Sequence, residues 1–130
     1  MTFQPQPLPA IPMTLAEAIA RMEGFYAAGQ VPNRPQRNNN PGDIEFGTFA
    51  QRFGAVSGDP RFAVFPSVEA GFAALNALLR EPSYHGLTLE QCINRYAPPV
   101  ENNTNLYVAA VCHWTGRQPG DVLNSFLEQA

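Results

Sequence analysis

The sequence predicts an α+β fold that is mainly α, with about five helices and a small antiparallel β-flap. Two capping boxes, at Thr14 and Thr88, each precede apolar residues at helical spacing. Alternation of apolar and polar residues, which is typical of strands, is confined to residues 43–66. The chain of 130 residues is long enough for one domain with a buried core, and its 45% hydrophobic residues indicate a globular protein.

The first predicted helix begins after Thr14 and ends before Gly24, because glycine is common just past a helix C-terminus. Its apolar residues share one face, and Glu23 falls at the margin of that face. We therefore expect the Glu23 carboxylate to lie half-shielded at the edge of the core. The proline-rich residues 1–13 are expected to form a flexible or extended tail before a domain of residues 14–130.

The β-flap is expected in residues 43–66, as two or three short antiparallel strands. Residues 44–46 and 61–65 alternate between apolar and polar side chains, and Phe49 and Phe53 lie between them. Four further helices are expected after the flap, over about residues 67–80, 88–96, 102–116 and 119–127. Each begins at a residue that commonly caps or starts a helix: Ser67, Thr88, one of Asn102, Asn103 and Thr104, and Pro119.

The net charge of -3 argues against a general nucleic-acid or membrane-surface binder. All eight basic residues are arginines. Four of them could still form a local positive rim, because they fall in the loop-rich middle of the chain: Arg34, Arg37, Arg52 and Arg61.

The cysteines and histidines suggest no metal or redox chemistry. Cys92 and Cys112 fall at or near apolar positions of predicted helices, so reduced, buried thiols are favoured, and a disulfide between them is left open. His85 and His113 are isolated, and we expect no metal site and no cofactor. No basic segment followed by an apolar run opens the sequence, and no stretch reaches membrane-spanning length, so we expect no ordinary signal peptide and no membrane span.

Glu23 is the strongest candidate for chemistry. A carboxyl group that acts as a general acid near neutral pH needs a raised pKa, and partial burial beside apolar groups would raise it. The alternative is a structural glutamate at a helix end, paired with Arg21 or Arg37. Spacing alone favours that structural alternative.

Amide side chains form the second candidate group. Asn38, Asn39 and Asn40 precede a Pro-Gly turn and could bind the hydroxyl or acetamido groups of a sugar. They could equally satisfy their own backbone as Asx-turns. Tyr96 and Asn102 add a phenol and another amide at a helix junction, where helix capping fully explains Asn102.

Four blocks occur in order along the chain: Glu23-Gly24-Phe25; NNNPGDI at residues 38–44; FAVFP at 62–66 with EAG at 69–71; and YAP at 96–98 with ENNTxxY at 101–107. Together they resemble the lysozyme-like superfamily, in its phage and bacterial lytic transglycosylase or muramidase-like branch. The resemblance spans about residues 14–116. It implies a lysozyme-like α-rich fold with a β-flap, a cleft between lobes, and peptidoglycan as substrate.

The same resemblance implies roles for individual residues. Glu23 matches the catalytic acid at the end of the first long helix. Asn39 and Asn40 match the flap wall, and Tyr96 matches an aromatic residue of the opposite lobe. Asp43 departs from the pattern, since the motif usually reads Asn-Pro-Gly-Asn, and it is either a second carboxylate or a turn cap. Phe65 and Asn102, which belong to the matching blocks, complete the expected substrate-binding set.

The expected function is therefore cleavage of the β-1,4 bond between N-acetylmuramic acid and N-acetylglucosamine, with Glu23 as a single acid and base. The partners are peptidoglycan glycan strands, and the protein reaches the cell wall by a route other than an ordinary signal peptide. The alternative is a non-catalytic glycan-binding or structural domain of a virion or secretion apparatus. The charge of -3 slightly favours that alternative, because peptidoglycan is itself anionic.

Overall fold

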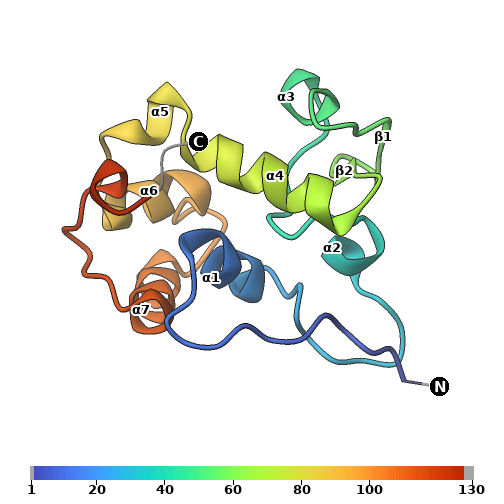
Figure 1. The fold of residues 1–130 in the computed structure, drawn as a ribbon, viewed down its shortest axis with the longest axis horizontal. Coiled ribbons are helices and arrows are strands. Elements are labelled where there is room, and N and C mark those ends of the chain that lie inside the picture. Colours follow the sequence, from blue (N-terminus) through green and yellow to red (C-terminus); the bar gives the residue numbers. More distant parts are fainter. Residues whose placement is uncertain (1, 128–130) are drawn as a thin grey trace.

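The computed structural model describes residues 2–127 and has an α+β architecture in which helices dominate (Figure 1). The described residues contain seven α-helices, one short 3-10 helix and one two-stranded antiparallel sheet. In chain order these are α1 (Leu15–Met22), α2 (Arg34–Arg37), α3 (Thr48–Gln51), β1 (Ser57–Gly58), β2 (Ala63–Val64), α4 (Val68–Leu79), α5 (Pro82–His85), α6 (Leu89–Tyr96), α7 (Thr104–Thr115) and η1 (Leu123–Ser125).

Four of the five predicted helices are confirmed, as α1, α4, α6 and α7. Both predicted capping boxes are formed; at α1 the Thr14 hydroxyl accepts from the Glu17 N–H at 3.1 Å and the Glu17 carboxylate accepts from the Thr14 N–H at 2.9 Å. Asn103 is the residue that caps α7, and Gly116 closes this helix with a φ of 72°. Local signals of this kind act within one turn of helix, so they are readable in sequence.

The fifth predicted helix, over residues 119–127, is wrong within the described residues, which hold only the 3-10 turn η1 there. Backbone hydrogen bonds to the start of α6 hold this segment in another conformation. The Leu89 N–H donates to the Asp121 carbonyl at 2.8 Å, and the Leu123 N–H donates to the Leu87 carbonyl at 2.9 Å. These contacts lie about thirty residues apart in sequence, so the apolar spacing of this segment could not indicate them.

The β-flap is present but smaller than predicted. Strands β1 and β2 pair antiparallel, with Ser57 opposite Val64 and Gly58 opposite Ala63, and residues 44–46 contribute only an isolated bridge from Glu45 to Phe62. Phe49 and Phe53, which the alternation placed in the flap, lie in and just after the helix α3. Their spacing of four residues brings the two rings to 5.3 Å between centroids, as a helical turn does.

Three short helices were not predicted: α2, α3 and α5. Helix α2 has its own capping box, in which Asn33 and Gln36 exchange hydrogen bonds of 3.1 and 2.8 Å. Pro82 lies just after α4 and is the first residue of α5, a position that suits proline. Each of these helices has four residues, too few for a hydrophobic period to be recognised.

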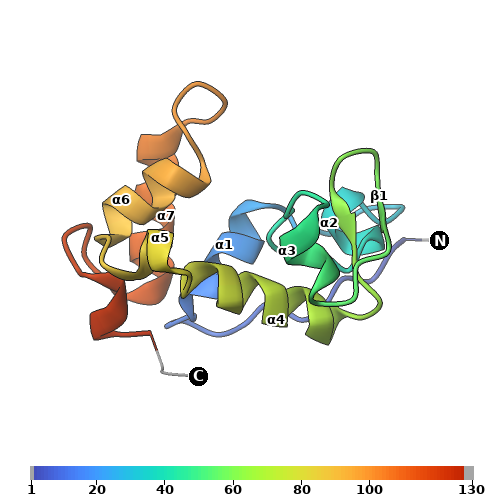
Figure 2. The same cartoon turned by 90° about the horizontal axis from the view of Figure 1, so that it is seen from above.

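The helices and the sheet form two lobes with separate cores. The larger core is built from α1, α4, α5, α6, α7 and η1, and the smaller core from α3, β2 and residues on one side of α4. Helix α4 runs from one lobe to the other (Figure 2). Its Leu75 and Leu79 are fully buried in the larger core, while Ala74 is buried in the smaller one. One helix therefore fixes the two lobes relative to each other.

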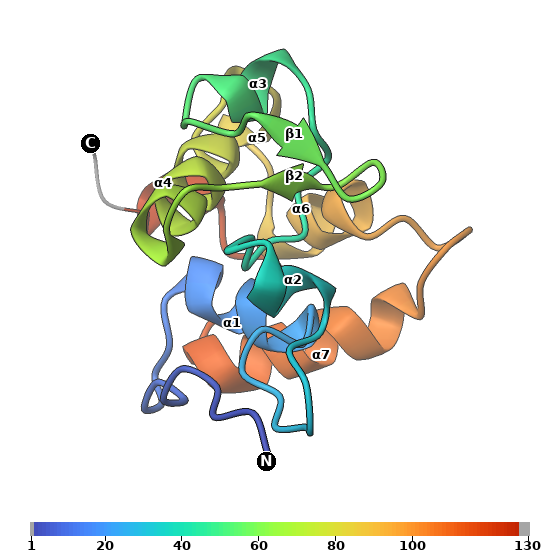
Figure 3. The ribbon, with the colours of Figure 1, turned by 90° about the vertical axis from the view of Figure 1, so that its right-hand side faces the viewer.

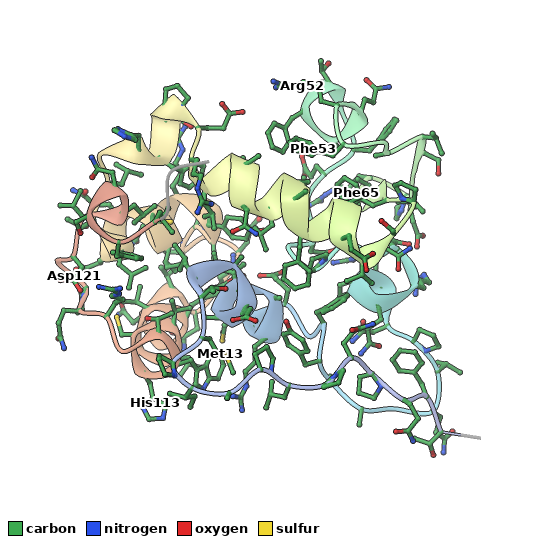
Figure 4. The ribbon with its side chains drawn as sticks, in the orientation of Figure 1. Met13, Arg52, Phe53, Phe65, His113 and Asp121 are labelled. Atoms are coloured by element: carbon green, nitrogen blue, oxygen red, sulfur yellow. The ribbon has the colours of Figure 1, made fainter. Side chains whose placement is uncertain are left out.

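The N-terminal segment is extended and packs against the domain at both of its ends. Phe3 forms an isolated bridge with Gly29, and the Met13 N–H donates to the Trp114 carbonyl at 2.8 Å. Met13 belongs to the larger core, beside α7 (Figure 4). The packed part of the chain thus starts before the capping residue Thr14. Across residues 2–127, no helix combines the length and the apolar character needed to cross a bilayer.

Candidate functional site

A cleft of about 460 Å³ lies between the two lobes and contains Glu23. Figure 3 shows the β-hairpin and the loop between α6 and α7 extending to the same side of the molecule. The smaller lobe and its loops contribute Arg34, Gly42, Asp43, Ile44, Glu45, Arg61 and Phe62 to the lining, and the larger lobe contributes Leu78, Tyr84, Tyr96, Ala97, Glu101 and Asn102.

Glu23 is held at the cleft by the way in which α1 ends. Its N–H still donates to the Ile19 carbonyl at 2.9 Å, so Glu23 is the last residue of the helical turn. Gly24 then takes a φ of 92°, a left-handed conformation that glycine adopts without steric cost. The next residue, Phe25, is buried and packs edge-on against Phe72 of α4, with ring centroids 5.7 Å apart. The turn after Glu23 is thereby anchored in the interior.

Burial raises the pKa of the Glu23 carboxyl above its ordinary value of 4.5, and this is the largest effect on the group. The Tyr107 hydroxyl donates to Oε2 of Glu23 at 2.9 Å, which lowers the pKa. The negative charge of Asp43 raises the pKa, and the positive charge of Arg34 lowers it. Tyr107 occupies Oε2, and no hydrogen bond to Oε1 is found within residues 2–127. Glu23 is thus a half-buried acid with one oxygen fixed by a neighbour.

Glu23 does not have the ion pair that the structural alternative required. The Arg21 guanidinium lies over the Trp114 ring, 4.3 Å from its centroid, and Arg37 pairs with Asp59 at 2.8 Å. Within residues 2–127 no ion pair to Glu23 is found. A neutralising arginine is therefore not the reason for a carboxyl group at this position.

Asp43 is held by Arg34 and is not a free second carboxylate. The Arg34 Nε donates to Oδ1 of Asp43 at 3.1 Å, and a second guanidinium nitrogen donates to Oδ2. The Asp43 side chain is only 8% exposed, and its φ of 51° follows from the tight turn after Gly42. The Cζ atom of Arg34 also lies over the Phe62 ring, 3.7 Å from its centroid. Both oxygens of Asp43 are occupied, so this carboxylate is poorly placed to activate water.

The amide groups of Asn39 and Asn40 serve the backbone. Asn40 is fully buried: its Nδ2 donates to the Ile44 and Ala63 carbonyls, both at 2.9 Å, and its Oδ1 accepts from the Ile44 N–H at 2.9 Å. Asn39 is half-buried, has a φ of 52° and donates to the Phe65 carbonyl at 3.2 Å. Neither residue lines the cleft. Their hydrogen bonds join the 38–44 turn to the β2 region, outside the lining of the cleft where a substrate-binding wall was expected.

The other three predicted binding residues fall in different places. Phe65 is buried in the smaller core and does not reach the cleft (Figure 4). Tyr96 lines the cleft, and its hydroxyl donates to the Gly42 carbonyl. Asn102 is exposed at the cleft, where its Nδ2 donates to the Pro98 carbonyl at 3.2 Å. The cleft thus brings together Glu23, Asp43, Tyr96 and Asn102, and it excludes Asn39, Asn40 and Phe65.

Each arginine of the expected positive rim is paired with an acid. Arg34 pairs with Asp43, Arg37 with Asp59, Arg52 with Glu81 at 3.9 Å, and Arg61 with Glu45 at 3.0 Å. The loop-rich middle of the chain therefore carries no unbalanced positive surface. Only Arg34 and Arg61 of the four line the cleft.

The cysteines and histidines take no part in the cleft. Cys92 and Cys112 are both free thiols, and burial raises the pKa of Cys92 to about 12. His113 is exposed on the outer face of α7 (Figure 4). No group of His, Cys, Asp and Glu residues that could hold a metal ion is found in the part of the chain that the structure describes.

Sequence reasoning missed the contacts that Tyr107, Arg34 and Phe62 make at the cleft. Tyr107 is buried on α7, and a buried tyrosine hydroxyl usually has a hydrogen-bond partner, which here is Glu23. For Arg34 and Phe62 no comparable local signal exists, since their contact forms only when α2 meets the turn between β1 and β2.

Neither the known protein-family models nor the curated proteins include a match to this sequence. The cleft and its residues are therefore the basis for the function.

Proposed function

We propose that this chain has a lysozyme-like architecture and cleaves the β-1,4 bond between N-acetylmuramic acid and N-acetylglucosamine in peptidoglycan, with Glu23 as general acid and base. The observation that carries the proposal is the state of Glu23: a carboxyl group with a raised pKa, one oxygen fixed by Tyr107, in a cleft between two lobes. A general acid at near-neutral pH requires such a raised pKa. The four blocks that resemble the lysozyme-like superfamily support the same reaction.

In the proposed reaction Glu23 donates its proton to the glycosidic oxygen as the bond from that oxygen to C1 breaks. The acetamido group of the muramic sugar stabilises the cationic centre at C1. The Glu23 carboxylate then takes a proton from the attacking hydroxyl group, so that the acid is regenerated. The attacking hydroxyl belongs either to water or to C6 of the same sugar.

The pairing of Asp43 argues against hydrolysis with inversion. Hydrolysis with inversion needs a free carboxylate that activates water, roughly 6.5–9.5 Å from the acid. Asp43 is engaged by Arg34 through both oxygens, and Glu45 is an exposed residue paired with Arg61. Of the two routes that need only Glu23, we propose attack by the C6 hydroxyl, which gives a 1,6-anhydro-muramyl product that is lighter by one water than the hydrolytic product. Mass spectrometry of digested glycan distinguishes the two, and reducing-end products that disappear in Asp43→Asn would contradict this product.

Zymography against purified peptidoglycan tests the reaction itself. Glu23→Gln should lower cleavage by about a hundredfold or more, because the general acid is lost while Gln can still accept from Tyr107. Glu90→Gln is the matched control, since Glu90 is an exposed acid on α6 that does not line the cleft. Cleavage by a folded Glu23→Gln protein at the native rate would refute the proposal.

The non-catalytic alternative is favoured by the charge of the cleft. Its lining has four carboxyl groups and two guanidinium groups, and peptidoglycan is itself anionic. A glycan-binding or structural domain of a virion or secretion apparatus would retain binding to insoluble peptidoglycan without releasing soluble fragments. Sedimentation with peptidoglycan, together with an empty zymogram for the wild type, would support this alternative.

A further inference from the structure

Arg34 is held rigidly in the cleft by two neighbours. Asp43 accepts from two of its guanidinium nitrogens, and the Phe62 ring lies 3.7 Å below it. Arg61 lies over the same ring at 4.8 Å. A guanidinium that is fixed before a ligand arrives loses little conformational freedom on binding.

Arg34 retains hydrogen-bond donors for a ligand. A guanidinium has five N–H donors, and Asp43 occupies two of them, which leaves three. The Arg34 side chain is 40% exposed and lines the cleft that contains Glu23. It is also close enough to Glu23 for its charge to lower the pKa of that carboxyl. A sugar bound in this cleft therefore meets both Glu23 and Arg34.

The charge around Arg34 favours an uncharged acceptor. Asp43 already balances the guanidinium, and a ligand carboxylate would be repelled by the other acids of the lining. A neutral carbonyl oxygen meets no such repulsion. The four carboxyl groups that line the cleft are Glu23, Asp43, Glu45 and Glu101.

We propose that Arg34 binds the carbonyl oxygen of an acetamido group on the sugar next to Glu23, and that Asp43 and Phe62 position its guanidinium for this contact. This inference rests on the proposed function, because the glycan is the ligand that the function supplies. It makes Arg34 a residue that selects N-acetylated sugars over deacetylated ones.

Binding of two neutral or basic probes tests the inference: tetra-N-acetylchitotetraose and its fully deacetylated counterpart. Both are titrated by calorimetry into Glu23→Gln protein, in which turnover cannot consume them. Adding Arg34→Gln should weaken binding of the acetylated tetramer about tenfold or more, the effect of a hydrogen bond to a charged donor. Binding of the deacetylated tetramer should stay the same or become tighter. Equal weakening of both probes, or no binding of the acetylated tetramer before the change, overturns the inference.

Two further variants separate binding from folding. Arg34→Gln alone leaves the Asp43 carboxylate, only 8% exposed, without its ion-pair partner, and this could destabilise the fold. A double variant, Arg34→Gln with Asp43→Asn, removes both charges. Asparagine also tolerates the positive φ of residue 43. This double variant should unfold close to the native temperature and still bind the acetylated tetramer weakly; native affinity overturns the inference. Arg37→Gln, on the same helix but outside the lining, is the matched control and should bind normally.

A third probe, a GlcNAc–MurNAc tetrasaccharide with free lactyl carboxylates, tests the choice of a neutral group. If Arg34→Gln weakens only this anionic probe, Arg34 is a carboxylate site and the inference is wrong. Failure of the proposed function gives a different pattern. A wild type that binds through Arg34 but cleaves nothing refutes cleavage alone, and cleavage with Arg34-independent binding refutes this inference alone.

Discussion

At Glu23, burial and the Tyr107 hydroxyl act on the carboxyl group in opposite directions. Burial raises its pKa, and the hydrogen bond of 2.9 Å from Tyr107 lowers it. Tyr107 is itself buried on α7, so its hydroxyl cannot turn to water. The balance of these two effects sets the pH range in which Glu23 keeps its proton.

We expect Tyr107→Phe to move the alkaline limb of the pH–activity profile to higher pH. The change removes an interaction that lowers the Glu23 pKa, so the carboxyl group keeps its proton to a higher pH. The rate at the optimum should fall, since Oε2 is no longer fixed. The measurement is kcat/KM against pH. Tyr26→Phe, outside the cleft, should leave the limb in place, and a limb that moves to lower pH in Tyr107→Phe would contradict the assignment.

Asn40→Ala should act on stability and not on catalysis. The change leaves the buried Ala63 carbonyl and the part-buried Ile44 N–H without their partner, while the Ile44 carbonyl keeps the Ala63 N–H at 2.8 Å. Each unpaired group costs roughly 1–3 kcal/mol. We expect the free energy of unfolding in urea to fall by about 3 kcal/mol, with native activity per folded molecule. Asn94→Ala, at an exposed site on α6, should change stability by less than about 0.5 kcal/mol. If the Asn40→Ala protein is stable but binds substrate weakly, Asn40 is a substrate-binding residue, as the sequence predicts.

Among the elements, α4 depends on a close approach to the 38–44 turn. A Cβ atom built on Gly71 would lie 2.0 Å from the Asn39 carbonyl oxygen and 2.7 Å from Cδ of Pro41. Backbone atoms cannot move aside as a flexible side chain can. The glycine in the middle of α4 is thus required by packing, at the place where this helix meets the smaller lobe.

Gly71→Ala should destabilise the protein by about 3 kcal/mol or more, although alanine has the higher helix propensity. Thermal unfolding measures the loss. Gly86→Ala is the matched control, because no atom lies within 4 Å of a Cβ built there and its φ of -96° suits alanine. A stabilised Gly71→Ala protein would show that propensity outweighs packing at this site.

For the whole molecule, the raised pKa of Glu23 couples stability to pH. A carboxyl group whose pKa is higher in the folded state binds its proton more tightly there, so its contribution to stability is complete below pH 4.5. That contribution is lost as the pH rises from 4.5 through the folded-state pKa. The charged Glu23 carboxylate therefore lowers stability at neutral pH.

We expect Glu23→Gln to be more stable than the wild type at pH 7, by a margin that shrinks as the pH falls to 4 and below. Comparing the two proteins at each pH cancels the titration of all other groups, including Asp59, whose pKa is lowered by its hydrogen bond to Arg37. The melting temperatures across this range give the margin. A margin that grows toward low pH would mean that the Glu23 pKa is lowered in the folded state.

The sequence by itself determined the helices that carry their own start and stop signals and the position of Glu23 at the end of the first of them. The Thr14 and Thr88 boxes and the Gly116 terminus act between residues three or four apart, so their spacing is sufficient. The apolar stripe of α1 likewise placed Glu23 at the margin of the core. These features follow from local geometry, which the order of residues specifies directly.

Only the tertiary structure decided which partners the polar side chains of the candidate site and of the 38–44 turn bind. Tyr107 reaches Glu23 from 84 residues away, Asn40 reaches Ala63 from 23, and Arg34 turns Asp43 from a candidate base into its ion-pair partner. The tertiary structure also placed Phe65 in the smaller core and the segment around Asp121 and Leu123 against the start of α6. The role of a polar side chain depends on the partners that lie next to it in the folded protein. Long-range packing brings those partners together, and the spacing of residues in the sequence does not specify it.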